Sequence, residues 1–166
     1  MVKNTLLPFI CVLLVSACSN NTGPAEKREF DLSFRYGVLA RNELNTFNNS
    51  ITKDLVLDGT VTMPLVLKPS DLARVESKMQ SIDFYSYPDT FMVKIVTGGA
   101  IGFSPANTYE LNVFSHGRRK SLYWSDCIVT ADSQAVKLRE LIALIREIVE
   151  STPEYKQLPP ARGGYI

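Results

Sequence analysis

The fold is decided by Phe30-Asp-Leu-Ser-Phe-Arg-Tyr-Gly-Val38, in which apolar side chains take every second position. The apolar members of this stretch are Phe30, Leu32, Phe34, Tyr36 and Val38. A period of two sends the two sets of side chains to opposite faces of a β-strand. The stretch therefore predicts a half-buried strand whose inner face is aromatic.

A hairpin is expected further along the chain, between residues 51 and 67. Its arms are Ile51–Leu57 and Thr60–Leu67, and Asp58-Gly59 separates them. Asp-Gly favours the type I′ turn, in which both central residues have positive φ. Pro64 cannot donate a hydrogen bond to a neighbouring strand, so the second arm is predicted to lie at a sheet edge or to carry a bulge.

Three other segments bear on the predicted sheet. A second hairpin is expected from Tyr109–Phe114 and Arg119–Trp124, joined by the tight turn Ser115–Arg118. The apolar run Phe91–Val96 predicts a buried strand. The Asn-rich stretch Arg41–Ser50 is interpreted as a loop.

Two helices follow from apolar residues at three-to-four spacing. The first begins at Ser70 as N-cap, and its buried stripe is predicted to be Leu72, Val75, Met79 and Ile82. The second has its stripe between Leu138 and Val149, a cap at Thr130, Asp132 or Ser133, and its end at Pro153. This order of elements predicts an α+β fold, an antiparallel sheet built from hairpins with two helices packed on one face.

The start of the chain has the layout of an export signal. A single early cation, Lys3, precedes the apolar run Leu6–Val15, and small residues follow. That run is too short to span a membrane, which takes roughly 20 residues. The final four residues of the segment, Val15-Ser16-Ala17-Cys18, resemble the lipobox of bacterial lipoproteins. The resemblance implies cleavage before Cys18 and lipidation of Cys18, and stable tethering takes two or more acyl chains.

We therefore divide the chain into four parts. Residues 1–17 are predicted to be a lipoprotein signal peptide, and residues 18–28 a lipidated cysteine with a polar, flexible stalk. Residues 29–152 are predicted to form a single α+β domain. Residues 153–166 are predicted to be a Pro/Gly-rich strap, irregular or polyproline-like, that lies along the domain.

Charge and cysteine content exclude several classes of function. The whole chain has 18 Lys and Arg against 17 Asp and Glu, and loss of the signal removes one cation. A mature chain of zero formal charge gives no reason to expect a nucleic-acid partner. After processing, Cys127 is the one thiol left, and we interpret it as a small buried hydrophobe.

We predict attachment to a membrane through lipid on Cys18, on the extracytoplasmic side of the cell envelope.

Catalytic and metal-binding patterns are sparse. The sequence has one histidine, His116, which is too few for a zinc site of three or four Cys and His ligands. Cys127 and His116 are placed at opposite ends of a predicted strand and are not expected to meet. Asp126, beside Trp124, is interpreted as a cap or turn residue before the second helix. We predict no catalytic residue, no metal and no cofactor.

The charged run Arg118, Arg119 and Lys120 is interpreted as a solvated turn or as a partner-binding contact. The first hypothesis for function is a non-enzymatic envelope module that binds a protein or a cell-wall component through its sheet or its second hairpin. One alternative is an inhibitor of a secreted or wall-active enzyme. The other is a carboxylate-based hydrolase, with candidate acids Glu43, Asp54, Asp83, Asp89, Glu110 and Asp126.

Beyond the lipobox, three segments look like those of small bacterial lipoproteins. They are Phe30–Gly37, Thr52–Leu55 and Pro153–Pro159. The resemblance implies processing and anchoring and brings no activity with it. Cys18 is the one functional residue that it carries over.

Overall fold

The computed structural model describes residues 29–93, 101–129 and 131–166. The predicted signal and stalk at 1–28, the end of the strand predicted at Phe91–Val96, and Thr130 lie outside the described residues. No helix in the described ranges is long and apolar enough to cross a membrane.

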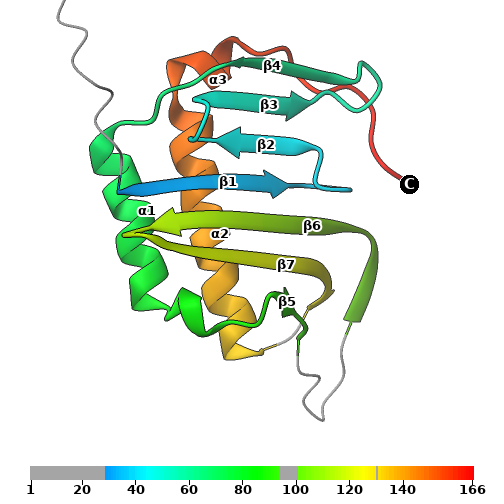
Figure 1. Cartoon of the computed structure of the whole chain (residues 1–166). Coiled ribbons are helices and arrows are strands. Elements are labelled where there is room, and N and C mark those ends of the chain that lie inside the picture. The colour runs from blue at the N-terminus through cyan, green and yellow to red at the C-terminus, as the bar shows by residue number, and fades with distance from the viewer. Residues whose placement is uncertain (1–28, 94–100, 130) are drawn as a thin grey trace, which may run out of the picture.

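One sheet of seven strands forms the body of the protein, in the order β4-β3-β2-β1-β6-β7-β5 (Figure 1). All neighbouring strands run antiparallel except β5 and β7, which are parallel. The strands are β1 (Phe30–Tyr36), β2 (Asn42–Asn45), β3 (Ser50–Asp54), β4 (Thr60–Pro64), β5 (Thr90–Phe91), β6 (Ile101–Ser115) and β7 (Arg118–Val129).

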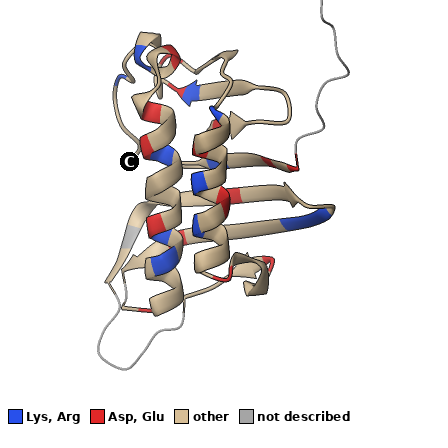
Figure 2. Cartoon of the chain, turned by 90° about the vertical axis from the view of Figure 1, so that its left-hand side faces the viewer, with Lys and Arg blue, Asp and Glu red and all other residues tan. Residues whose placement is uncertain are grey.

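The two long helices cover one face of this sheet. α1 (Pro69–Ser81) and α2 (Ser133–Ser151) lie side by side, and much of the charge on them faces away from the sheet (Figure 2). The short elements η1 (Phe84–Ser86) and α3 (Pro153–Gln157) follow α1 and α2. The predicted α+β fold, with two helices on one face of a largely antiparallel sheet, is therefore confirmed.

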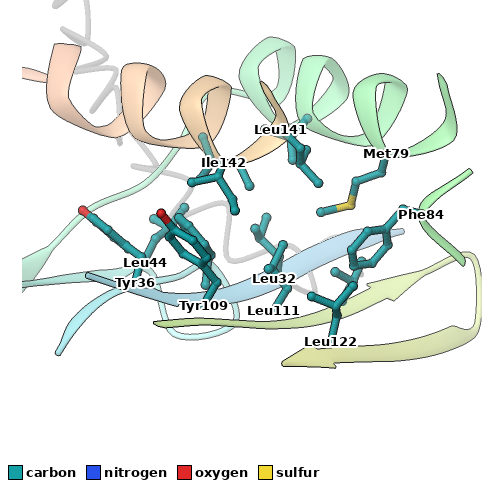
Figure 3. Close-up of a cluster of buried hydrophobic side chains, with 14 of the residues drawn as sticks. Leu32, Tyr36, Leu44, Met79, Phe84, Tyr109, Leu111, Leu122, Leu141 and Ile142 are labelled. Carbon is teal, nitrogen blue, oxygen red and sulfur yellow. The ribbon is translucent and has the colours of Figure 1, made fainter. Parts of the chain in front are cut away.

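The core lies between the helices and the sheet. Buried and half-buried side chains alternate strictly along β1, with Leu32 and Phe34 fully buried, as the period of two predicts. Leu141 and Ile142 of α2 and Met79 of α1 point at the strands from above (Figure 3). Burying each such side chain contributes about 1.5–3 kcal/mol, so this layer supplies most of the driving force for folding.

Three local expectations were wrong. Arg41–Ser50 is not a loop throughout, because Asn42–Asn45 forms β2 and buries Leu44 against the core. Leu44 is the one apolar residue of β2, and a single apolar residue cannot reveal the two-residue period of a strand. Lys68, rather than Ser70, is the N-cap of α1, since Pro69 takes the first helical position, where it needs no amide hydrogen. The strand expected at Phe91–Val96 is the two-residue β5 in the described part.

The end of the chain also differs from the expectation. Pro153 begins α3 instead of an irregular tail, and the Thr152 hydroxyl caps this helix by accepting a hydrogen bond from the Tyr155 amide. Tyr155 and Leu158 pack on the core as partly buried residues. Further on, the tail pairs with the loop between β3 and β4 through a parallel bridge from Arg162 to Val56.

Candidate functional site

The helices leave one face of the sheet uncovered, and we call it the open face (Figure 1). It carries the alternate side chains of every strand, those that do not enter the core. On β1 these are Asp31, Ser33 and Arg35, each half-buried between the two neighbouring strands. The same alternation that builds the core therefore also builds this surface.

Cross-strand register arranges the open face into rows that run perpendicular to the strands. The first row crosses all seven strands in the order Thr62, Thr52, Glu43, Arg35, Glu110, Tyr123 and Thr90. The second row consists of Pro64, Ser50, Asn45, Ser33, Asn112 and Ser121. Neighbouring members of a row are about 4.8 Å apart, and the rows are separated by about 6.7 Å, or two residues. The result is a regular array of side chains that are polar except for Pro64 at the edge.

Hydrogen bonds between members hold the array in place. Arg35 Nη1 lies 3.0 Å from Glu110 Oε2, and Ser33 Oγ donates to Glu43 Oε1 at 3.2 Å. The Thr52 and Thr62 hydroxyls are 2.7 Å apart at one side of the sheet. At the other side, Ser121 Oγ donates to Asn112 Oδ1 at 2.8 Å. These contacts use only part of the hydrogen-bonding capacity of each group, so donors and acceptors remain available to a ligand.

The charges on the open face are mixed. Glu43 and Glu110 stand beside Arg35 on its two neighbouring strands, and Arg35 forms its ion pair with Glu110. Neither row contains a lysine. Tyr123 is 43% exposed and offers an aromatic surface beside Glu110. Hydroxyl, amide and carboxylate groups beside an exposed ring suit hydrogen bonding to a hydroxylated ligand better than binding of a highly charged one.

The predicted binding run Arg118, Arg119 and Lys120 does not form one patch. It lies at the tip of the β6–β7 hairpin (Figure 2), and strand alternation sends its members to different sides. Arg118 lies over the Tyr85 ring and Lys120 pairs with Asp89 at 2.6 Å, both on the helix side. Arg119 alone belongs to the open face, where it lies over the Phe114 ring, 5.6 Å from its centroid.

Of the candidate acids, Glu43 and Glu110 share the first row on either side of Arg35, and no third candidate acid belongs to that row. Asp126 lies within β7, is buried and binds Arg139 through two hydrogen bonds, 2.9 and 2.6 Å long, so its predicted role as a helix cap or turn residue is wrong. The cap of α2 is Asp132, whose side chain accepts from the amides of Gln134 and Ala135. Among residues 29–93, 101–129 and 131–166, no group of three or more His, Cys, Asp or Glu could hold a metal ion.

His116 and Cys127 take the separate positions that the sequence suggests. His116 is in the turn before β7, 3.4 Å from a carboxylate oxygen of Glu29 and of Glu76. Cys127 is near the far end of β7 and is partly buried, so the interpretation as a small buried hydrophobe holds only in part. By the alternation along β7, the Cys127 side chain is on the open face, outside the two rows.

Sequence reasoning missed the two rows of the open face. The polar residues between the apolar positions of β1 were visible, but which residue of another strand stands beside each one depends on register. Register is set by turn length and by long-range pairing, and no pattern within one strand reports it.

Comparisons with known proteins give two distant relatives. A PKHD-type hydroxylase from Pseudomonas fluorescens strain Pf0-1 is 24% identical over 137 residues, which cover 74% of this chain and 59% of the hydroxylase. A PKHD-type hydroxylase from Pseudomonas fluorescens strain Pf-5 is 25% identical with the same coverage. The chain thus spans about three fifths of the length of these relatives. No family model matches the chain, and no solved structure matches it significantly.

The residues of this chain do not fit one common form of hydroxylase chemistry. Non-haem iron oxygenases hold the metal through two histidines and one carboxylate. The sequence has a single histidine, in the β6–β7 turn, and cannot supply that set of ligands. We therefore assign no hydroxylation step to any of its residues.

Proposed function

We propose that this protein is a lipid-anchored, non-enzymatic binding module on the extracytoplasmic side of the cell envelope, and that its open face binds a cell-wall glycan. The anchor rests on the lipobox resemblance of Val15–Cys18. The binding role rests on one observation, the two registered rows of polar side chains on the uncovered face.

A glycan suits this surface for two physical reasons. A polysaccharide offers hydroxyls at regular intervals along an extended chain, and the rows offer donors and acceptors at regular intervals across the sheet. The face has acids and arginines in mixed order and no lysine in its rows, so it does not favour a polyanion such as nucleic acid. Tyr123 adds an aromatic ring on which the apolar face of a sugar can stack.

Binding is tested with the full lipidated chain in detergent, by sedimentation with insoluble cell-wall glycan. The double variant Asn112→Glu with Ser121→Glu places two new charges on exposed, neighbouring positions of the second row. We expect affinity to fall about tenfold, because a lost hydrogen bond costs about 0.5–1.5 kcal/mol and like charge is added to Glu110 nearby. The matched control is Ser77→Glu with Gln80→Glu on the outer surface of α1, which should bind like the wild type.

A second pair of variants compares neighbouring cations. Arg119→Ala should weaken sedimentation with the glycan, whereas Arg118→Ala should leave it unchanged, because only Arg119 lies on the open face. Equal retention of the wild type and of the double variant would contradict the proposed binding face. Equal loss in the Arg118 and Arg119 variants would move the site to the hairpin tip.

The anchor has its own test. Mass spectrometry of the mature N-terminus should find acyl chains on Cys18, and Cys18→Ser should release the protein from the membrane fraction. A chain that keeps an unmodified Met1 would contradict both the anchor and the location.

A further inference from the structure

A small hollow lies on the helix side of the sheet, away from the open face. It has a volume of about 150 Å³ and lies where the end of β1 and the middle of β6 meet the C-terminal half of α2. Its lining includes Tyr36, Tyr109, Tyr155, Arg146, Glu150 and Asn107. Figure 3 shows the hydroxyls of Tyr36 and Tyr109 pointing toward the same end of the core, away from Met79 and Phe84.

The Tyr36 hydroxyl is the unusual group of this hollow. Tyr36 is only 4% exposed, and its hydroxyl makes no hydrogen bond of normal geometry within the described residues, although the neighbouring Tyr155 hydroxyl interacts with it. A buried polar group left without a partner costs about 1–3 kcal/mol. Burial, followed by the nearby Tyr155 and Glu150, raises the pKa of Tyr36 far above its ordinary value, so the phenol keeps its proton and can donate. Burial likewise raises the pKa values of Tyr109 and Tyr155.

Arg146 and Glu150 form the outer wall and cancel each other's charge. Arg146 Nη2 lies 2.9 Å from Glu150 Oε1, and the guanidinium lies 5.9 Å from the centroid of the Tyr36 ring. The two side chains are 48% and 40% exposed, and an ion pair so exposed is worth about 1 kcal/mol or less. Turning Arg146 outward therefore costs little and uncovers the Tyr36 side chain.

We propose that this hollow binds a neutral sugar unit, with the Tyr36 hydroxyl donating to it. Its volume corresponds to about five water molecules, which limits the ligand to roughly one ring. The phenols and the amide can donate to and accept from sugar hydroxyls, and the carboxylate can accept from them. An anionic ligand would meet Glu150 and a cationic ligand would meet Arg146, so the paired wall selects for a neutral one.

Three sugars of one size and different charge test the proposal on the full chain in detergent, by ligand-detected NMR at mildly acidic pH. Glucose should bind, and glucuronate and glucosamine should bind several-fold more weakly. Tyr36→Phe should weaken glucose binding about tenfold, the value of one hydrogen bond, while the thermal midpoint stays the same or rises because an unpaired buried hydroxyl is removed.

The matched control is Tyr85→Phe, since the Tyr85 hydroxyl is also buried without a partner and lies elsewhere, under Arg118. This variant should keep the wild-type affinity for glucose. The proposal is overturned if glucose does not bind, if Tyr36→Phe binds it as tightly as the wild type, or if glucuronate or glucosamine binds more tightly than glucose. A hollow that holds only water gives the first of these results. The hollow and the open face are on opposite sides of the sheet, so either site can fail while the other stands.

Discussion

The hairpin β6–β7 runs through the interior of the sheet, whereas the hairpin β3–β4 forms its edge. In β6–β7, Ser115 pairs directly with Arg118, and both residues between them have positive φ, 46° at His116 and 82° at Gly117. In β3–β4, the last pair is Asp54 with Thr60, so five residues form the loop. Of the predicted Asp58-Gly59 turn, only Gly59 has positive φ.

The difference arises from what each loop touches. The β3–β4 loop holds the C-terminal strap. The Leu57 amide donates to the Arg162 carbonyl at 3.3 Å, and the Arg162 amide donates to the Leu55 carbonyl at 3.2 Å. The Arg162 side chain binds Asp58, with Nε 2.7 Å from Oδ2. A two-residue turn would leave no backbone free for this pairing. A turn signal thus predicts that a hairpin forms, while tertiary contacts decide its turn.

The largest expected effect separates the interior hairpin from the edge. Trp124 of β7 is fully buried and packs against Phe91 and Tyr109, with ring centroids 5.4 and 5.6 Å away. Trp124→Ala should lower the free energy of unfolding by about 3–5 kcal/mol in chemical denaturation. Met63→Ala on β4 removes a partly buried side chain and should cost clearly less. Equal costs would mean that the edge hairpin carries as much of the core.

The two turn glycines are expected to behave alike despite the different loops. Gly59 and Gly117 have φ of 75° and 82°, and an added Cβ would meet no atom within 4 Å at either position. Gly59→Ala and Gly117→Ala should therefore each cost about 1–2 kcal/mol, the conformational penalty alone. Thermal denaturation of both variants checks this, and a much larger loss at one position would reveal a contact that forms only there.

The strap should stabilise the edge hairpin alone. Arg162→Ala removes an exposed ion pair with Asp58, so global stability should fall by less than about 1 kcal/mol. Hydrogen exchange at the Leu55 and Leu57 amides should become faster, while exchange in β6 and β7 stays unchanged. Faster exchange throughout both hairpins would show that the β3–β4 and β6–β7 hairpins open together, and would contradict a strap that stabilises β3–β4 alone.

The smallest effect concerns the titration of Asp58. The hydrogen bond from Arg162 lowers the pKa of this carboxyl below its ordinary value of 3.8. Its contribution to stability is therefore present above that ordinary value and is lost as pH falls through the lowered pKa. NMR should find the midpoint below 3.8 in the wild type and near it in Arg162→Ala. Arg74→Ala, which removes a distant exposed cation on α1, should leave the midpoint unchanged.

Most of the fold could be predicted because its signals are periodic and local. The alternation in β1 and the stripes on α1 and α2 were recognised, and the residues they placed in the core are buried except Val38, which is half-buried and lies beyond the end of β1. β2 was missed because it offers one buried residue, Leu44, and α3 was missed because Pro153 both ends one helix and begins the next. The candidate sites were harder to predict from the sequence. Arg118 and Arg119, which were expected to act together, lie on opposite faces of the sheet.

By itself, the sequence determined the spacing at which apolar side chains recur in β1, α1 and α2, the presence of the β3–β4 and β6–β7 hairpins, and the resemblance of Val15–Cys18 to a lipobox. Tertiary structure alone decided that Thr62, Arg35 and Tyr123 share one row, and that Tyr36 and Glu150 line one hollow. It also decided that Arg162 meets Asp58, 104 residues away. Periodicity is a property of neighbouring residues, whereas register and docking depend on which distant segments bury the most apolar surface together.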